Sequence, residues 1–537
     1  MEFINISNIK INNNDIELEF LYKDTSIGND TCVFIEDNNK KRYDCIFSKS
    51  QNSIVFSYNN NEQVEIAKVL IKIPILSYGK MKIKLEDSKG VIDLKIRNNK
   101  NESISYKENP YIIFLKSYKI EISEEGIELT RRKCGEKLKY ELNKLVYGLK
   151  KYNKLFIYRF FKTKEPKYYL FNDRLLYGDD NAEELFIYIN KNNPEFAKKC
   201  YFVLDKESKS IHRIKKIGKV VKYGTFSHKI KFINCRMLLS SHASYLRSRF
   251  NPFNEIEMDI YKDIINKKFV FLQHGISMND VREYLNRELI TADLFVTSTE
   301  KEFEFISSEG FMYEPNMVTL TGLSRFDKLK NEINKVILIS PTWRNLEEKI
   351  NFEDSLYYKS YRSLLANEKL NELLKNKGYK IEFLLHPVFV EHKHLFEEFS
   401  NEYIQVLDSC EIRYSELFNK CAIFITDYSS IHYDVATLQK PIIYYQFDKQ
   451  FFFENQYKRG YFDYEKDGFG KVIENEEQIV NDIENYLNND CKIEEKYKKR
   501  IENTFRYLDN NNCQRLFEKI IELDNNGDIN YRFNNVH

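Results

Sequence analysis

The stretch from Ala422 to Asp434 reads AIFITDYSSIHYD and sets the expectation for the fold. Its first four residues are all apolar, as in a strand that is buried on both faces of a parallel sheet. Polar residues follow, and a helix is predicted from Ser430 to Leu438 with Asp427 or Ser429 as its N-cap. The free N–H groups at such a helix start attract phosphate, although the same residues also suit an ordinary cap that serves only the backbone.

Short apolar runs of this kind recur in two successive sets, separated by longer segments of mixed charge. Such alternation is typical of parallel strands with crossover helices. The first set comprises Leu155–Tyr158, Tyr201–Leu204, Met237–Ser240, Phe269–Leu272, Leu294–Thr297 and Met317–Leu320, and the second comprises Val336–Ile339, Ile381–Leu385, Ile404–Leu407, Ala422–Ile425 and Pro441–Tyr445. The pattern predicts two doubly wound α/β domains facing a cleft, over residues 153–328 and 329–523.

The N-terminal part has a different pattern. Alternating runs such as Ile16–Phe20, Ser53–Phe56 and Val91–Ile96, separated by Asn- and Asp-rich turns, predict a small β-rich domain over residues 1–125. Leucines at helical spacing predict a connecting helix within residues 126–152. The polar end, residues 524–537, is expected to be a frayed tail.

Composition narrows the class of protein. A chain of 537 residues is too long for one hydrophobic core. The formal net charge of +2 gives no overall field for nucleic acid, which we do not expect as a partner. The nine cysteines are scattered without metal or redox spacing and are expected to be buried and reduced. No signal peptide or membrane-spanning run is recognisable, so work at a membrane would take place on its surface.

Side chains suited to chemistry follow the predicted strands. His274 comes directly after the strand ending at Leu272, where an imidazole with a pKa near neutrality suits a general base. Arg344 and His386 follow two neighbouring strands and could reach a pyrophosphate, while Asp434 is placed to accept ribose hydroxyls. Each has a plainer interpretation: a histidine bonded to a neighbouring loop, residues that close a turn, or a capped helix.

Together these segments resemble, in order and spacing, the CDP-glycerol glycerophosphotransferase family, which includes teichoic acid and capsule polyol-phosphate polymerases and primases. The resemblance rests on seven short elements: Asn172–Arg174, Gly178–Ala182, His274-Gly275, Gly322 with Arg325 and Asp327, Pro341–Arg344, His386-Pro387, and Asp427–Ser430 with Asp434 and Lys440–Ile442.

The resemblance implies a GT-B fold in which the C-terminal domain holds the donor and the N-terminal domain receives the acceptor. It implies transfer of glycerol phosphate from CDP-glycerol to a hydroxyl of a lipid-linked or polymeric anionic glycan, with release of CMP. The implied catalytic residues are His274 and His386; the donor-binding residues are Arg325, Thr342, Arg344, His386, Ser429, Ser430 and Asp434; the acceptor-side residues are Asn172, Arg174, Asp180, Asn181, Gly275 and Ser277. No obligatory metal is expected, apart from Mg²⁺ held loosely on the donor.

Several alternatives stay open. The same scaffold would serve a glycosyltransferase that uses a nucleotide-sugar, a polymerase that uses CDP-ribitol, or a carbohydrate-binding scaffold without activity. The basic stretch Lys206–Lys231 suits either an anionic membrane or polymer surface, or merely a solvated face. The resemblance places the chain in the cytoplasm, peripherally on the inner face of the cell membrane. The polyol, the acceptor, the choice between primase and polymerase, the role of the β-rich domain and the oligomeric state are not specified by the sequence.

Overall fold

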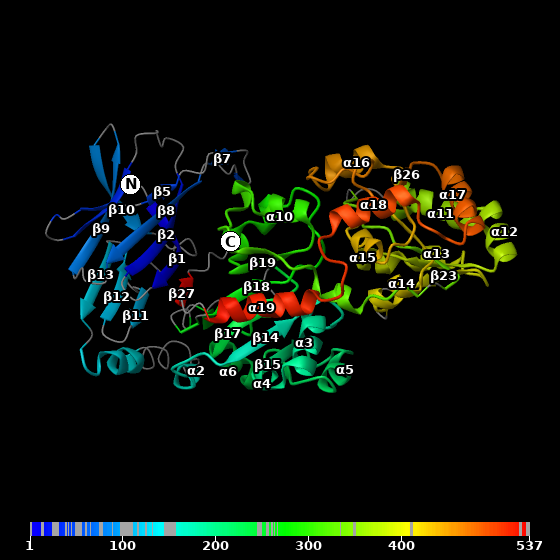
Figure 1. Cartoon of the computed structure of the whole chain (residues 1–537). Helices are drawn as coiled ribbons and strands as arrows, with labels where there is room; N and C mark the ends of the chain where they lie inside the picture. Colours follow the sequence, from blue (N-terminus) through cyan, green and yellow to red (C-terminus); the bar gives the residue numbers. More distant parts are fainter. Residues whose placement is uncertain are drawn as a thin grey trace.

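A β-rich part and two α/β parts follow one another along the chain (Figure 1). The computed structural model describes residues 157–532 except 244–249, 254–256, 259–260, 262–263, 266, 333, 347–350, 409–411 and 526–528. Before residue 157 it describes the strand residues given below together with residues 40 and 133–143. Of the predicted runs, Ser53–Val55 and residues 144–156 therefore lie outside the described residues.

The N-terminal part is built from strands that are antiparallel to their neighbours, as predicted, except that β1 and β10 pair in parallel. Its main sheet runs in the order β11-β12-β13-β9-β10-β1-β2-β8-β5, with β3 on β9 and β4 on β3. The strands are β1 (Phe3–Ile11), β2 (Asp15–Lys23), β3 (Cys32–Asp37), β4 (Arg42–Asp44), β5 (Ile46–Ser48), β8 (Ile66–Pro74), β9 (Gly79–Asp87), β10 (Gly90–Ile96), β11 (Tyr111–Phe114), β12 (Tyr118–Ser123) and β13 (Gly126–Arg131), with β6 (Phe56–Tyr58) and β7 (Glu62–Val64) as a separate pair.

This sheet includes two strands that lie outside the predicted range of residues 1–125. Strand β13 pairs with β12 and β9, so the sheet continues past residue 125, and the connecting helix is described only at residues 136–143. The tail also returns to the sheet: β27 (Ile529–Arg532) pairs antiparallel with β1, with Asn8 opposite Arg532. The prediction of a frayed tail is therefore wrong for these residues, because backbone pairing with β1 orders them.

The first α/β sheet is fully parallel and runs β16-β15-β14-β17-β18-β19-β20, an order in which the chain reverses direction between β14 and β17. Its strands are β14 (Tyr168–Asn172), β15 (Cys200–Leu204), β16 (Val220–Lys222), β17 (Cys235–Ser240), β18 (Lys268–Phe271), β19 (Leu294–Thr297) and β20 (Val318–Leu320). Five of the six predicted runs are strands. The prediction for Leu155–Tyr158 is wrong, because helix α2 (Ile157–Phe160) occupies its described residues and β14 opens the sheet instead.

The second α/β sheet repeats this topology in the order β23-β22-β21-β24-β25-β26, again fully parallel. Its strands are β21 (Val336–Ile339), β22 (Lys380–Leu384), β23 (Ile404–Leu407), β24 (Ile423–Thr426), β25 (Ile442–Tyr445) and β26 (Gly470–Ile473). The first five were all predicted. The two sheets confirm an α/β protein with two doubly wound domains, as in a GT-B fold.

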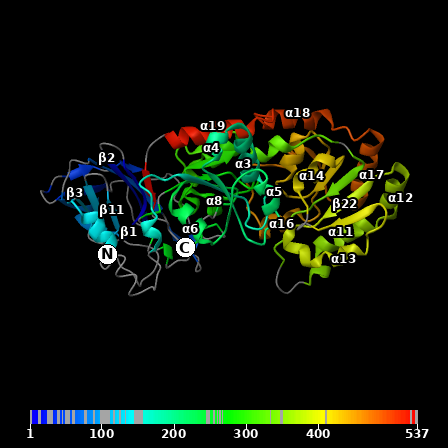
Figure 2. The same ribbon diagram turned by 90° about the horizontal axis from the view of Figure 1, so that it is seen from below.

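Helices cover both sheets (Figures 1 and 2). Those of the first domain are α3 (Asn181–Asn192), α4 (Pro194–Ala197), α5 (Ile211–Lys215), α6 (Phe226–Ile233), α8 (Arg282–Leu285), α9 (Arg287–Ile290), α10 (Glu300–Ile306) and the 3₁₀ helices η1 (Glu309–Phe311) and η2 (Ser324–Lys328). Those of the second are η3 (Phe352–Asp354), α11 (Leu356–Ala366), α12 (Glu368–Lys377), η4 (Pro387–His392), α13 (His394–Glu397), α14 (Tyr414–Lys420), α15 (His432–Thr437), α16 (Lys449–Asn455), α17 (Glu476–Asn488) and α18 (Glu495–Thr504).

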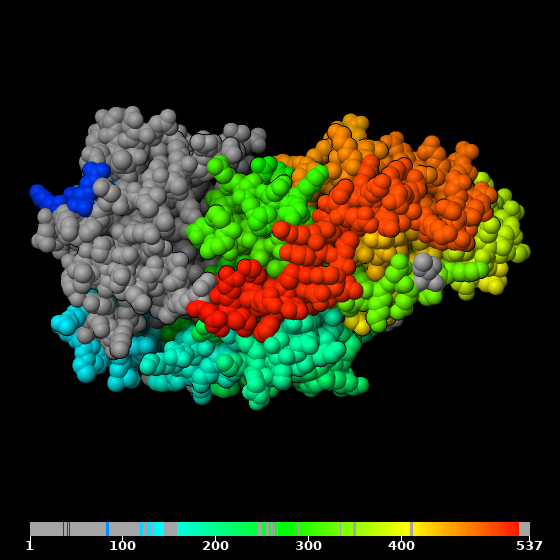
Figure 3. Space-filling model, in the orientation of Figure 1, coloured from blue at the N-terminus to red at the C-terminus, as the bar shows by residue number. Residues whose placement is uncertain are grey.

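The last helix, α19 (Asn512–Asn525), crosses back from the second domain onto the first. Its start is held by Asp327, which accepts hydrogen bonds from the N–H groups of Asn512 (3.0 Å) and Cys513 (2.8 Å). At its end Asp524 accepts from the Tyr169 hydroxyl (2.7 Å) and pairs with Arg236. Figure 3 shows α19 (red) lying over the surface of the first domain. The predicted second domain, residues 329–523, thus ends in a helix that packs on its neighbour.

The predicted environment of the cysteines holds in part. Five of those whose side chains are described are buried and free, namely Cys200, Cys235, Cys421, Cys491 and Cys513. Cys134 is free but exposed, which corrects the prediction for that residue.

Candidate active site

The two points at which the chain reverses direction bring the polar strand ends to one region. In the first sheet the reversal lies between β14 and β17, followed by Arg174 and His242, and in the second it lies between β21 and β24, followed by Thr342 and Ser429. Doubly wound sheets bind ligands outside the carboxyl ends of their strands at such points.

His274 lies in the loop after β18 with just over half of its side chain exposed, at 52%. Its Nδ1 lies 2.5 Å from Oδ2 of Asp180, and its Nε2 lies 3.0 Å from Nη2 of Arg174. A guanidinium only donates hydrogen bonds, so Nε2 accepts from Arg174 and Nδ1 carries the proton that is donated to Asp180. This is the tautomer in which Nε2 holds the lone pair that a general base needs.

The loop around His274 is held in a sterically demanding conformation. Gln273 has a left-handed backbone with φ of 63°. Its carbonyl accepts from Nδ2 of Asn181 (2.8 Å), and its side chain donates to Glu302 (2.9 Å), which also accepts from the N–H of Ser277 (2.7 Å). Asn181 and Ser277 are buried and used in this way. They were predicted to face the acceptor, but in the structure they support the loop that carries His274.

Asp180 connects His274 to the second domain. Its Oδ1 accepts from Nη1 of Arg325 (2.8 Å), and Arg325 forms a two-pronged pair with Asp434 on α15 (2.7 and 2.8 Å). Burial disfavours a charged carboxyl, yet Arg325 and His274 hold the pKa of Asp180 below its usual value. Arg325 and Asp434 were predicted to bind the donor. The structure instead buries them in an ion pair between the two domains.

Two more aspartates in the segment after β14, Asp173 and Asp179, stabilise the surroundings of Asp180. Asp179 accepts from Nζ of Lys328 (2.8 Å) and from Nε of Arg413 in the second domain (2.9 Å). Asp173 accepts from the N–H groups of Ala182 (2.9 Å) and Glu183 (3.1 Å), at the start of α3. The segment after β14 therefore anchors the domain junction and the loop of the predicted base.

Asn172, predicted on the acceptor side, does not face the site. It is buried, and its Nδ2 donates to the carbonyl of Val203 (2.9 Å) on the neighbouring strand. Arg174, two residues further, is half-buried and contacts the His274 and His242 rings. Of the predicted acceptor-side residues, Arg174, Asp180 and Gly275 lie at His274, whereas Asn172, Asn181 and Ser277 serve the framework.

The two predicted halves of the site meet at Gly275 and Ser430. A Cβ added at Gly275 would lie only 2.6 Å from Oγ of Ser430, so a larger residue here would displace that hydroxyl. Ser429 and Ser430 are half-buried beside it. The loop of the predicted base thus lies against Ser430, one of the two predicted donor-side serines.

The predicted start of the helix after β24 is wrong. Helix α15 begins at His432, and no side chain caps it. Asp427 accepts instead from the N–H groups of Thr342 (2.9 Å) and Tyr428 (2.6 Å). Asp427 does not cap the helix because its carboxylate pairs with a buried arginine.

That arginine is Arg344, whose side chain is 1% exposed between Asp427 (2.9 Å) and Asp448 (2.6 Å). The rings of Tyr357 and Tyr428 lie beside its guanidinium. The prediction that Arg344 contacts the pyrophosphate is corrected: it fixes the loops after β21, β24 and β25. Thr342, half-buried next to it, donates its N–H to Asp427 and remains at the strand end.

His386 stays accessible at the end of β22, where it is half-buried. Its Nδ1 accepts from the N–H of Val388 (3.3 Å), so the proton of the neutral ring sits on Nε2. Burial lowers the pKa of His386 to about 4, and the charges of Arg174 and His274 act in the same direction. His386 is therefore a neutral hydrogen-bond donor at pH 7.

His242 was missed by sequence reasoning. Its ring stacks on that of His274 with centroids 5.2 Å apart, and its Nε2 lies 3.4 Å from Nε of Arg174. It follows β17 directly, so its position at a strand end was the available signal. The short spacing Ser240-Ser241-His242 carries no recognisable motif.

Other motif residues are structural. Gly322, with φ of 80°, lets Asn512 at the start of α19 come close. Lys440 is buried, and its Nζ donates to the carbonyls of Phe418 (2.8 Å), Asn419 (2.5 Å) and Cys421 (2.7 Å) at the end of α14. These residues maintain the domain framework.

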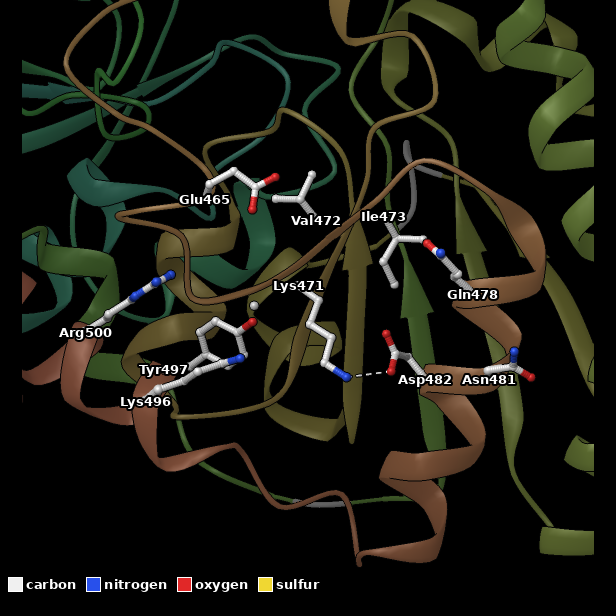
Figure 4. Close-up of a pocket in the computed structure, with 11 residues that line it drawn as sticks. Glu465, Lys471, Val472, Ile473, Gln478, Asn481, Asp482, Lys496, Tyr497 and Arg500 are labelled. Carbon is white, nitrogen blue, oxygen red and sulfur yellow. Dashed lines mark hydrogen bonds and ion pairs between the residues drawn. The ribbon is translucent and has the colours of Figure 1, made fainter.

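A cavity of about 410 Å³ lies elsewhere, along β26 and helices α17 and α18 (Figure 4). Its charged lining is largely paired: Lys471 binds Asp482 (2.6 Å), and Arg500 donates to the carbonyl of Gly468 (2.8 Å). None of the predicted site residues lines it.

Within the described part of the chain, no group of three or more His, Cys, Asp or Glu side chains is arranged to hold a metal ion. None of the helices described there is both long and apolar enough to cross a lipid bilayer.

The sequence of both α/β domains matches a known protein family. The family described as CDP-glycerol:poly(glycerophosphate) glycerophosphotransferase matches residues 153–522. The minor teichoic acid biosynthesis protein GgaB of Bacillus subtilis (strain 168) is 38% identical over 408 residues, which is 73% of this chain and 44% of that protein. The teichoic acid poly(glycerol phosphate) polymerase of the same organism is 24% identical over 345 residues, covering 58% of this chain and 43% of that protein.

The chain thus spans less than half the length of these two relatives. Among solved structures, the wall teichoic acid polymerase TagF is similar with a TM-score of 0.52 at 17% identity, over 72% of this chain and 98% of that one. At this identity the likeness shows the fold, which is the same pair of doubly wound domains. With the family match covering both α/β domains, the chain belongs to the CDP-glycerol:poly(glycerophosphate) glycerophosphotransferase family.

Proposed function

We propose that this protein transfers glycerol phosphate, or a related polyol phosphate, from a CDP-activated donor to a hydroxyl of a teichoic acid or similar anionic polymer. The observation that carries the proposal is the pairing of His274 with Asp180, next to the contact between Gly275 and Ser430. In this tautomer the lone pair of the base is on Nε2, and the base lies between the domain proposed to hold the acceptor and the domain proposed to hold the donor.

In the proposed reaction, Nε2 of His274 takes the proton of the acceptor hydroxyl as its oxygen attacks the β-phosphorus of the donor. The bond between that phosphorus and the bridging oxygen breaks, and CMP leaves. Asp180 accepts the hydrogen bond from Nδ1–H and stabilises the imidazolium that forms, as expected of a carboxylate at 2.5 Å. The acceptor proton remains on His274 until it passes to CMP or to water.

On the donor side we assign the diphosphate to Ser429, Ser430 and the Nε2–H of His386. All three are half-buried at strand ends and carry donors that can reach a ligand. Neutral donors aimed at a developing negative charge stabilise it without needing to reorganise. We propose no obligatory metal; transfer that stops with EDTA and returns with Mg²⁺ would refute this point.

The test is to incubate the protein with CDP-glycerol, CDP-ribitol or a UDP-sugar together with a teichoic acid acceptor, and to identify the released nucleotide. We expect CMP, and the CDP-polyol that gives it identifies the donor. UDP release would assign a glycosyltransferase instead. Binding of the polymer without release of any nucleotide would assign a binding scaffold.

We also propose that the protein works in the cytoplasm, on the inner face of the membrane. Support comes from an aromatic group on α2 and α6: Phe160, Phe161 and Phe226 are 63%, 45% and 50% exposed. The basic stretch Lys206–Lys231 lies along the same domain, but part of it is occupied, since Arg213 pairs with Glu183 and Lys229 with Glu257. Exposed aromatic rings in a domain that also carries exposed lysines suit an anionic lipid surface.

A further inference from the structure

Arg174 donates a hydrogen bond to Nε2 of His274, the nitrogen atom that the proposed reaction requires as a base. Its Nη2 lies 3.0 Å from Nε2 of His274, while Nδ1 of the ring is bonded to Asp180. Both ring nitrogens are therefore engaged. As long as Arg174 donates to Nε2, the lone pair cannot accept the proton of a hydroxyl.

The surroundings of Arg174 lack a counter-charge. Within the described part of the chain no carboxylate lies within ion-pair distance of its guanidinium, whose side-chain contacts are with the rings of His242 and His274. Asp180, the carboxylate that binds His274, is already bound by Arg325. An arginine that is held only by imidazoles prefers an anion, and phosphate matches its planar set of donors.

A third imidazole completes the group. His386, from the second domain, is close enough for the charge of Arg174 to disfavour its protonation, and its Nε2–H is a free donor in the neutral ring. Arg174, His242 and His274 thus form a nitrogen-rich cluster from three strand ends, and His386 lies within range of the charge of Arg174. A phosphate entering this cluster would meet donors from both domains.

We infer that Arg174 is a phosphate-responsive cap on His274: without ligand it covers the Nε2 lone pair, and a substrate phosphate draws its guanidinium away. The inference rests on the proposed function. The phosphate belongs either to the terminal unit of the acceptor or to the diphosphate of the donor. In either case His274 becomes a base only when a phosphate-bearing substrate is in place, which protects the activated donor from water.

The first experiment measures the lone pair without any substrate. Diethyl pyrocarbonate acylates unprotonated imidazole nitrogens, and mass spectrometry follows its rate at His274, with exposed His212 as the internal reference. Loss of one hydrogen bond should speed acylation of His274 about fivefold in Arg174→Met. Arg362→Met, which removes an exposed arginine of the second domain, is the matched control and should leave the rate unchanged. Equal rates in wild type and Arg174→Met would overturn the inference.

The second experiment identifies the phosphate. Isothermal titration compares sn-glycerol 3-phosphate, which mimics the acceptor end, with CMP, which mimics the donor. Arg174→Met should weaken one of them about tenfold or more, and the one affected is the source. Arg174→Lys keeps the charge but not the planar pair of donors, and its affinity for that ligand should lie between those of the wild type and Arg174→Met. If neither ligand is affected, Arg174 does not bind phosphate. Neither readout needs turnover, so failure of the proposed reaction would be seen separately.

Discussion

His274 and Asp180 lie 2.5 Å apart through Nδ1 and Oδ2, and the other oxygen of Asp180 receives Nη1 of Arg325 at 2.8 Å. Because Arg325 is in turn bound to Asp434 in the second domain, the orientation of the imidazole depends on a chain of charged groups that spans both domains. The ring is therefore positioned correctly only when the two domains are in this arrangement.

Replacing Asp180 by Asn should lower kcat on the order of 10²-fold, because the imidazole loses both its orientation and the charge that stabilises its protonated form. KM for the donor should change little, since the carboxylate of Asp180 is bound to His274 and Arg325 rather than to the donor serines. Steady-state kinetics of CMP release would show whether kcat falls while KM for the donor is unchanged. Asp354→Asn, an exposed carboxyl in the second domain, is the control. A fall in donor affinity with kcat intact would assign Asp180 to binding instead.

His274→Ala should remove turnover almost entirely, a loss on the order of 10³-fold or more, while CDP binding stays near that of the wild type. The physical reason is that the ring accepts the proton but is 52% exposed, so its removal leaves the framework intact. Titration calorimetry with CDP, next to CMP release, separates the two effects. A fully active His274→Ala protein would eliminate the general-base role.

Ser429→Ala combined with Ser430→Ala should weaken CDP binding by about 1–3 kcal/mol, the sum of two neutral hydrogen bonds. The domain contact should persist, because Cβ of Ser430 remains next to Gly275. Calorimetry of CDP binding and a thermal melt check both points. Ser400→Ala, at an exposed serine, is the control. Unchanged CDP affinity would move the diphosphate away from this pair.

Most strands of the two α/β sheets were predictable because they are short, mainly apolar runs that end in polar residues. Three strands were missed: β14, although its sequence is mainly apolar, β16, which is Val220–Lys222 between lysine-rich segments, and β26, which begins with a glycine. Strand β27 could not be foreseen, because its order comes from pairing with β1 at the far end of the chain. Pairing over such a separation leaves no local signal.

The candidate site was predictable as a set of strand ends but not in the direction of its side chains. Arg344 and Asp434 have the residue types that bind nucleotides, yet each is neutralised by a buried partner, Asp448 and Arg325 respectively. A charged side chain is used for folding or for ligands depending on which partner the fold brings to it. That partner lies about a hundred residues away in sequence, beyond any motif.

His432 should make the protein sensitive to acid. It is fully buried among the rings of Tyr433, Phe462 and Phe469, and burial lowers its pKa to about 3. In the unfolded chain its pKa is about 6.5, so between these values only the unfolded state takes up the proton. Stability is therefore complete above pH 6.5 and falls as the pH drops toward 3.

Replacing His432 by Phe removes this proton uptake. The loss of unfolding free energy between pH 7 and pH 5 should shrink by about 2 kcal/mol, since each pH unit below 6.5 contributes about 1.4 kcal/mol. Urea melts at both pH values measure it. His212→Gln, at an exposed histidine, should leave the difference unchanged. If His432→Phe also leaves this difference unchanged, the imidazole of His432 is not kept neutral by its surroundings.

The aromatic group on α2 and α6 should drive binding to anionic vesicles. Phe160 and Phe226 are 63% and 50% exposed, and inserting both rings at the lipid interface contributes more than the charge of any single lysine, which is about 1 kcal/mol. Phe160→Ser with Phe226→Ser should weaken binding to phosphatidylserine vesicles about tenfold or more in a sedimentation assay. Leu356→Ser, at a residue that is 54% exposed on α11, is the control for a lost apolar side chain elsewhere.

Lysines near the lipid contribute an electrostatic attraction that salt screens. Raising the ionic strength should therefore weaken vesicle binding of the wild-type protein. Binding that ignores both salt and the two phenylalanines would place the membrane contact on another surface.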